Sequence, residues 1–358
     1  MNRVTLGDVC KKASSNIAQK DLNGNEGEYP IYGASGYIKT VDFYHQEEPY
    51  IAIVKDGAGI GRTMLLPAKS SVIGTMQYIL LKEDKNVDLD YLYYAIVHMN
   101  LGKYFSGATI PHIYFKDYQK EPLNLPDMHE QQQIASIFKK IDALISGRKE
   151  QIEHLDELVK SRFIELFGDP VSNQHGYEKV SLSELADIKI GPFGSLLHKE
   201  DYIEGGHPLL NPSHIVDGKI APDNKLSISE DKYSELSAYQ LHVGDVVMGR
   251  RGEMGRCAVV PDEGYLCGTG SLMIRTKGDV TADYIQKVIS FPSFKKTIED
   301  MAVGQTMPNL NVPIVSSFQI IKPPIEVQNR YYAFVEQVDK SKYCRCKSRT
   351  LLQKAASI

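Results

Sequence analysis

The sequence of 358 residues contains no tryptophan, only five cysteines and no uninterrupted apolar segment long enough to cross a membrane. An odd number of widely separated cysteines argues against a disulfide framework. Cys344 and Cys346 form a C-x-C pair without a second ligand pair, so we expect no zinc site. The N-terminus does not resemble a signal peptide. These features predict a cytoplasmic protein with reduced thiols, no bound metal and no membrane contact.

An excess of one charge sign is also missing. The 41 Lys and Arg residues stand against 45 Asp and Glu, a formal net charge of −4, so no global basic field identifies a nucleic-acid partner. With 24% charged and 42% apolar residues the composition is that of an ordinary soluble globular protein. The length predicts two or three domains.

The familiar enzyme motifs are missing as well. There is no HExxH and no nucleophile elbow, and "LNPSHI" and "IKPPIE" do not match the Asn/Asp-Pro-Pro-aromatic loop of amino methyltransferases. Pro222-Asp223 with Glu230 and Lys232 imitates a nuclease PD…ExK pattern, but "APDNKLSISEDKYSE" is too polar for the core strands of such a site. We therefore expect a chain without catalytic residues.

A glycine-rich stretch, "KDGAGIGR" (55–62), follows the apolar run 50–54. A phosphate cradle requires a helix N-terminus after such glycines. Here the β-prone segment "TMLL" and Pro67 follow, which favours a tight hairpin between two strands. Nucleotide binding remains the minor alternative.

Internal repetition supports the hairpin. "GRRGEMGR" (249–256) follows a second apolar run about 195 residues later, and "SGATIP" (106–111) corresponds to "VGQTMP" (303–308). The period is too long for a solenoid, so it indicates two homologous domains in tandem. The two glycine loops share position but not spacing, which a hairpin tolerates better than a phosphate cradle.

Each copy ends in a long predicted helix. The first follows Asp127, which with Glu130 forms a capping box, and it stops at Gly168. Apolar residues at alternating steps of four and three predict a coiled-coil seam, with a poorer seam in the second helix. The positions of the two seams are Ile134, Phe138, Ile141, Ile145, Arg148, Ile152, Leu155, Val159, Arg162 and Leu166, and Tyr331, Val335, Val338, Lys342, Arg345, Arg349 and Leu352. If the helices pack antiparallel, they hold the two domains apart around a pseudo-twofold axis.

These features occur in this order and in two copies. Together they resemble the specificity subunits of type I restriction–modification systems. The resemblance covers essentially the whole chain. It is carried by "EQQQI" after "PLNLP", by "FIELFGDP" (163–170) and by the opening segments "YPIYGASGYI" (29–38) and "GPFGSLLHKEDYIEGGHPLLNPSHIVDG" (191–218). The second copy departs from the pattern, with Glu326-Val327-Gln328 in place of "EQQ".

The resemblance implies an α+β chain with two tandem homologous α/β target recognition domains, separated by two long helices packed as an antiparallel coiled coil. The expected boundaries are 1–126 and 169–324 for the recognition domains, and 127–168 and 325–358 for the spacer helices. Each domain would read one half of a bipartite, asymmetric site in double-stranded DNA. The helices would set the gap and dock two methyltransferase subunits, and restriction–translocase subunits would join the complex. S-adenosylmethionine, ATP and Mg would bind only to those partners.

Two alternatives stay open. The chain could serve a type II-like restriction–modification enzyme, or it could be a coiled-coil scaffold whose end domains bind proteins.

Candidate DNA-contacting side chains are the donors and acceptors on the predicted loops, because arginine on guanine and amides on adenine are the commonest base contacts. A structural role in turns is the competing interpretation for the amides. The predicted contact residues are Lys55, Arg62, Gln77, His112, Ser195, Lys199, Arg250, Arg251, Arg256, Gln305 and Asn309.

Overall fold

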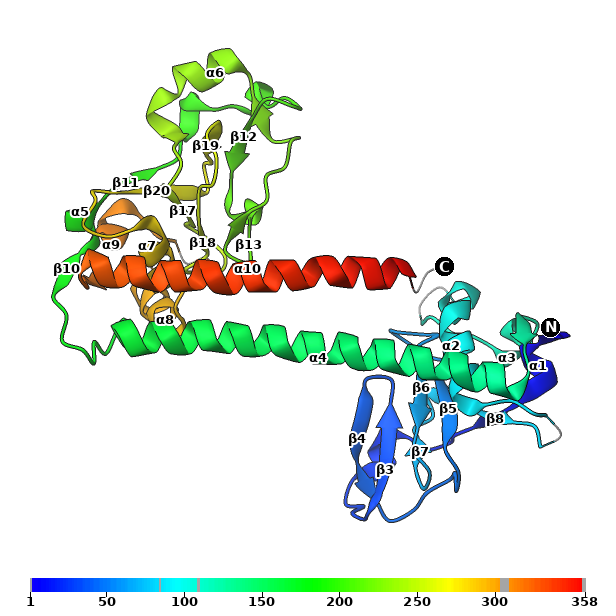
Figure 1. Cartoon of the computed structure of the whole chain (residues 1–358). Helices are drawn as coiled ribbons and strands as arrows, with labels where there is room; N and C mark the ends of the chain where they lie inside the picture. Colours follow the sequence, from blue (N-terminus) through cyan, green and yellow to red (C-terminus); the bar gives the residue numbers. More distant parts are fainter. Residues whose placement is uncertain (1, 84, 108–109, 303–308, 356–358) are drawn as a thin grey trace. The chain divides into compact units, whose positions relative to one another are not determined.

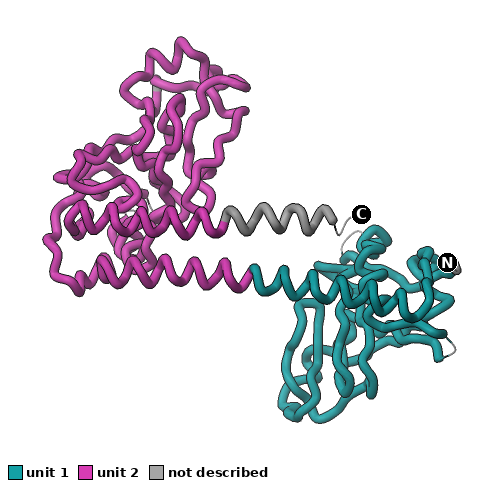
Figure 2. The backbone as a smooth tube through the Cα atoms, viewed as in Figure 1, with its two compact units in different colours: residues 1–148 teal, residues 149–358 magenta. Residues whose placement is uncertain are grey.

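The chain forms two compact units, Met1–Arg148 and Lys149–Ile358 (Figure 2). A computed structural model describes residues 2–83, 85–107, 110–302 and 309–355, without the side chains of Asn2, Ser195 and residues 343–355. The boundary between the units lies within a helix of 40 residues, α4 (Met128–Phe167), which runs on from the first unit into the second (Figure 1).

In the first unit, a four-stranded antiparallel sheet has the order β2-β8-β5-β6. A three-stranded sheet has the order β4-β3-β7, in which β3 and β7 are parallel. The elements before α4 are β1 (Asn2–Thr5), α1 (Leu6–Val9), β2 (Cys10–Ser14), β3 (Tyr29–Gly33), β4 (Gly36–Val41), β5 (Tyr50–Val54), β6 (Thr63–Leu66), β7 (Ser71–Val72), β8 (Met76–Leu81), α2 (Leu89–Met99), η2 (Leu101–Tyr104), α3 (Phe115–Tyr118) and β9 (Pro122–Leu125).

The core of the first unit lies between the four-stranded sheet and α2. Ile51, Ile53 and Ile79 from the sheet pack with Leu92 and Ile96 of the helix, and all five side chains are buried. The β-branched run of β5 favours a buried strand. Asp88 starts α2 by accepting a hydrogen bond from the Tyr91 amide at 2.9 Å, as N-cap residues do.

The second unit repeats this plan with different side chains. Its first sheet has the order β11-β20-β17-β18, and a second four-stranded sheet has the order β15-β12-β19-β16, in which β12 and β19 are parallel. Its elements are β10 (Lys179–Ser181), α5 (Leu182–Leu185), β11 (Ala186–Ile190), η3 (Gly194–Leu196), η4 (Lys199–Asp201), β12 (His207–Leu210), β13 (Ile215–Val216), β14 (Lys219–Ile220), β15 (Ser227–Ile228), α6 (Glu230–Glu235), β16 (Gln240–Leu241), β17 (Val246–Gly249), β18 (Cys257–Val259), β19 (Tyr265–Cys267), β20 (Ser271–Thr276), α7 (Ala282–Ile289), α8 (Pro292–Met301), α9 (Val312–Ser316), β21 (Gln319–Ile321) and α10 (Ile325–Ala355).

The two units therefore share one topology. The order β2-β8-β5-β6 corresponds to β11-β20-β17-β18, and the pair β1-β9 corresponds to β10-β21. The tandem repeat expected from the sequence is thus a repeat of structure. One expectation needs correction: among the strands that the structure describes, the pairs β3-β7 and β12-β19 are parallel and the other pairs are antiparallel, so each domain is α+β rather than α/β.

The ends of α4 follow the local signals in the sequence. The Glu130 amide donates to the Asp127 carboxylate at 2.9 Å, which satisfies one free N–H group of the first turn. Gly168 has a φ of +71° and its amide donates to the Ile164 carbonyl at 2.8 Å. Glycine ends helices in this conformation because it carries no Cβ.

Within the second unit, the C-terminal part of α4 packs against α10. Phe163 and Phe167 are fully buried and lie edge-on to Tyr331, at centroid distances of 5.5 and 5.4 Å. Lys342, farther along α10, pairs with Asp156, which comes earlier in α4, at 2.6 Å. The contacts follow the two helices in opposite directions, so these segments are antiparallel.

The residues of α4 that are buried in this contact differ from those of the predicted seam. Arg162 is half-buried and pairs with Glu165 on its own helix at 2.6 Å, while Phe163 takes the fully buried place beside it. The physical reason is that apolar side chains at steps of four, Val159, Phe163 and Phe167, complete the core of the second unit. Arg345, Arg349 and Leu352 have side chains outside the described part of the chain.

Candidate nucleic-acid interface

The glycine stretch of the first unit is a hairpin loop. Ile51 and Ile53 of β5 pair with Leu65 and Thr63 of β6, and the loop between these strands contains Gly57, Gly59 and Gly61, all with positive φ. At Gly61 a Cβ would lie 2.4 Å from the Gly102 amide nitrogen, so the backbones approach too closely for any other residue. A strand follows the loop instead of a helix, so the phosphate-cradle alternative is wrong.

A second predicted segment docks against this loop. The Gly57 amide donates to the Pro111 carbonyl at 2.9 Å, and the Ile113 amide donates to the Lys55 carbonyl at 3.0 Å. Between them, Asp56 accepts from Lys55 at 2.5 Å and forms a close contact with His112. The candidate residues Lys55 and His112, which are far apart in the sequence, therefore share one carboxylate.

The second unit assembles its loop in the same way. The Leu310 amide donates to the Arg250 carbonyl, and the Arg250 amide donates to the Gly270 carbonyl, both at 3.0 Å. In the first unit the corresponding Lys55 amide donates to the Thr75 carbonyl at 3.0 Å. The glycine loop and the segment about 55 residues after it thus form one edge in each unit, which we call the recognition edge (residues 55–62 with 110–113, and 249–256 with 309–311).

The arginines of the second loop have different surroundings. Arg250 is half-buried and its Nε donates to the Leu310 carbonyl at 3.0 Å. Arg256 pairs with Glu253 at 2.8 Å, and Lys295 of α8 pairs with the same carboxylate at 2.9 Å. These bonds lower the pKa of Glu253. Arg251 is exposed and forms no hydrogen bond or ion pair with the residues that the structure describes, so its five donors face solvent.

Two of the other predicted contact residues lie at the surface, and a third is half-buried. Arg62 is exposed and donates to the Ala34 carbonyl at 2.7 Å, and Lys199 is exposed in η4. Asn309 is half-buried, and its Oδ1 atom has no partner in the described part of the chain. Gln305 and the side chain of Ser195 lie outside the described residues.

The predicted DNA contact of Gln77 needs correction, because this side chain is buried. Its side chain is only 3% exposed, and its amide donates to the Tyr118 hydroxyl at 2.5 Å. In β8 its neighbours Met76 and Tyr78 are buried as well, so the strand is covered on both faces. A base could reach Gln77 only if the core opened.

Three large apolar side chains near the recognition edges were not among the predicted contacts. Phe105 precedes the segment that docks on the first loop and Ile110 begins it, and they are 64% and 65% exposed; Phe193 in the opening loop of the second domain is 65% exposed. Apolar side chains contact thymine methyl groups or wedge between base steps. For Phe193 the signal in the sequence was an aromatic residue beside glycine, in "PFGS", which a search for hydrogen-bonding groups passes over.

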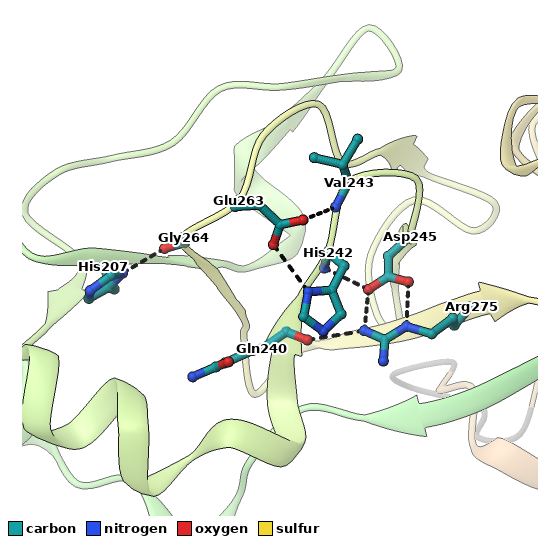
Figure 3. Close-up of polar contacts among 8 residues, drawn as sticks. All are labelled: His207, Gln240, His242, Val243, Asp245, Glu263, Gly264 and Arg275. Carbon is teal, nitrogen blue, oxygen red and sulfur yellow. Dashed lines mark hydrogen bonds and ion pairs between the residues drawn. The ribbon is translucent and has the colours of Figure 1, made fainter.

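An ion pair between the buried Asp245 and the partly exposed Arg275 supports the strand that leads into the second loop (Figure 3). Arg275 donates from Nε and Nη2 to the two carboxylate oxygens of Asp245, at 2.7 and 2.6 Å, and this contact raises the pKa of Arg275. The His242 amide donates to Asp245 at 2.8 Å, and the Val243 amide donates to Glu263 at 2.9 Å. The Arg275 bonds tie the turn before β17 to β20, and the Glu263 bond ties the same turn to the turn before β19, so the cluster is structural.

A polar cavity of about 470 Å³ lies beside the second loop. Asp217 and Glu253 line it together with Arg256, Lys287 and Lys295, so charges of both signs face it. Within the described ranges, no three His, Cys, Asp or Glu side chains are grouped to hold a metal ion, and no helix is long and apolar enough to span a bilayer.

The comparisons with known proteins agree with one another. The family model "Type I restriction modification DNA specificity domain" matches residues 1–154 and 174–344. The type I restriction enzyme MjaVIII specificity subunit of Methanocaldococcus jannaschii is 23% identical over 387 residues, which cover 98% of this chain and 89% of that protein.

Two solved structures share the fold. The type I restriction–modification S subunit of M. genitalium has a TM-score of 0.62 at 16% identity and covers 99% of this chain and 93% of its own. A chain from work on complex assembly and conformational transition of the type I R-M system has a TM-score of 0.57 at 15% identity, with coverages of 99% and 95%.

Proposed function

This chain belongs to the type I restriction–modification DNA specificity family, and from that premise we propose that its two recognition edges read the two halves of a bipartite site in double-stranded DNA. One observation carries the proposal: each unit assembles the same pair of segments, a glycine hairpin and a docked strand-like segment, by corresponding backbone hydrogen bonds. Two similar edges with different side chains suit two different short base tracts. Base contacts on such loops provide specificity, while phosphate contacts provide affinity.

The remaining parts of the proposal concern the long helices and the partners. The helices α4 and α10 form an antiparallel coiled coil that sets the number of unread bases and docks two methyltransferase subunits. Restriction–translocase subunits join for cleavage. Because the chain has a formal net charge of −4, it binds DNA weakly alone and depends on its partners for phosphate contacts. S-adenosylmethionine, ATP and Mg belong to those partners, and this chain is non-catalytic.

The test is to express the chain with its methyltransferase subunits and to sequence the methylated bases of the host DNA. We expect one motif with two short specific tracts and a fixed gap. The purified chain alone should transfer no methyl group, cleave no DNA and hydrolyse no ATP. A contiguous motif, or methyl transfer by the chain alone, would contradict the proposal.

A further inference from the structure

Each long helix starts with a buried glutamine that binds the recognition domain preceding it. In α4, Gln131 is 1% exposed. Its Oε1 accepts from the Asp88 amide at 2.8 Å, and its Nε2 donates to the carbonyls of Pro126 at 2.9 Å and Asn86 at 3.2 Å. One side chain thus joins the first turn of the long helix to the start of α2.

The second unit contains the same arrangement. Gln328 of α10 is fully buried. Its Oε1 accepts from the Thr281 amide at 2.9 Å, and its Nε2 donates to the carbonyls of Pro323 at 2.9 Å and Asp279 at 3.5 Å. The partners correspond one by one to those of Gln131, although the surrounding sequences differ.

The chemistry of these sites requires glutamine. Burying an amide is unfavourable unless its donors and its acceptor are all bonded. Here each site offers one backbone N–H group and two carbonyls, so it needs one acceptor and two donors on a single side chain. Glutamate lacks the donors and lysine lacks the acceptor. The neighbouring Gln132 and Gln133 are exposed, so a glutamine-rich segment alone does not explain the burial.

The residues bonded to these glutamines begin helices that pack on the strands of the recognition edges. Asp88 and Thr281 are the N-cap residues of α2 and α7. Helix α2 packs on β5 and β6, and α7 packs on β17 and β18, the strands that carry the two glycine loops. A single helix therefore separates each buried glutamine from its hairpin.

We propose that Gln131 and Gln328 are positioning residues that fix the orientation of each recognition edge on its long helix and thereby hold the gap between the two half-sites to one length. This inference rests on the proposed function. A second bond in each unit supports the same joint: the Tyr91 hydroxyl donates to the Asn124 carbonyl at 2.6 Å and the Tyr284 hydroxyl to the Ile321 carbonyl at 3.0 Å. The hydroxyls hold α2 to β9 and α7 to β21, and the glutamines hold α2 and α7 to the long helices.

The first experiment measures the joint itself by hydrogen–deuterium exchange in the full chain. Gln131→Leu should increase exchange at least tenfold in residues 86–92 alone, and Gln328→Leu should do so in residues 279–285 alone. Gln132→Leu, the same change at an exposed position, should alter neither. If Gln328→Leu does not fold, Gln328→Glu keeps the size and the acceptor and should give the same local effect. Unchanged exchange in the buried variants would overturn the proposal.

The second experiment measures function in the complex with methyltransferase subunits. The wild-type complex should methylate sites of a single gap. Each leucine variant should methylate sites one base pair longer or shorter at least ten times more than wild type, with both base tracts unchanged. Lower methylation without a change in gap would show a merely structural role and overturn the inference. Wild-type methylation without a bipartite motif would instead refute the proposed function.

Discussion

Arg250 and Arg251 are neighbours in the chain with opposite surroundings. Arg250 uses its backbone and its Nε to hold Leu310, so its side chain is part of the recognition edge. Arg251 is exposed without a partner among the residues that the structure describes. Arg251 keeps its Nε and both terminal nitrogens for a guanine, whereas Arg250 has already bonded its Nε and keeps only its two terminal nitrogens.

Separate substitutions should distinguish these roles. Arg251→Ala should leave thermal unfolding unchanged and weaken recognition in one half-site, by about 1–3 kcal/mol if a guanine contact is lost. Arg250→Ala should lower the stability of the second unit by about 1 kcal/mol, the usual net contribution of such a hydrogen bond. The measurements are calorimetry of the chain and the methylated motif of the complex. If Arg251→Ala changed both half-sites equally, the two edges would not read independently.

Glu121 gives a prediction about pH. It accepts hydrogen bonds from Lys103 and Tyr104, both at 2.5 Å, and these contacts lower its pKa. A carboxylate with a lowered pKa in the folded state stabilises the protein above its ordinary pKa, and this contribution is lost as pH falls through the folded-state value.

Glu121→Gln should therefore lower the melting temperature at pH 7, and the difference from wild type should shrink below about pH 4. Thermal unfolding at a series of pH values measures this. Glu26→Gln, at an exposed position, is the control and should show no such trend. A difference that stayed constant down to pH 2 would mean that the charge of Glu121 is unimportant.

At the scale of residues, the sequence predicted the positions of loops better than it predicted which side chains are exposed. The glycines were correctly expected to form hairpin loops, because turn chemistry is local, while the DNA contacts of these loops stay a prediction. Gln77 failed because its partner Tyr118 lies 41 residues away and burial on both faces of β8 removes the alternation that a strand normally shows. Only tertiary structure reveals such a partner.

At the scale of elements, the ends of helix α4 were predicted well and its buried face was predicted less well. Its start at Met128 and end at Phe167 agree with the predicted cap at Asp127 and stop at Gly168, because capping depends on adjacent residues. The side of the helix that is buried was predicted less well. A heptad places Arg162 on the seam, whereas Phe163 packs against Phe291 at 5.3 Å and against Tyr331. The core of the second unit, not the heptad, determines this face.

Phe163→Ala should therefore destabilise the second unit by about 3–5 kcal/mol, as other losses of buried aromatic side chains do. Exchange should increase in α10 around Tyr331 and in α7, while residues 2–83 keep their protection. Ile164→Ala, on the same helix but at a side chain that is 38% exposed, is the matched control and should have a small effect. Equal effects of the two variants would mean that α4 does not contribute to this core.

At the scale of the whole molecule, the duplication was the most informative feature of the sequence. Matching glycine loops and prolines about 195 residues apart predicted two copies of one domain, and the corresponding strand orders confirm them. Topology could be inferred because insertions change loop lengths without changing which strands pair. How the long helices set a distance on DNA remains a prediction, and it can be tested by changing their length.

Seven residues inserted after Glu150, with seven more after Lys347, should lengthen both helices by about 10.5 Å and keep both seams in register. That length is close to three base pairs of about 3.4 Å each. We therefore expect the two base tracts to stay the same and the gap between them to widen by about three base pairs. The second half-site also rotates by about a third of a turn, so activity should fall.

The methylated motif in cells that carry the lengthened subunit is the measurement. A matched control inserts the same seven residues after Gly24, a turn position where no neighbouring atom approaches, and should leave the gap unchanged. Both helices must be lengthened together, because lengthening one alone breaks the alignment of the seams. If the doubly lengthened subunit stayed active with its original gap, something other than these helices would fix the spacing.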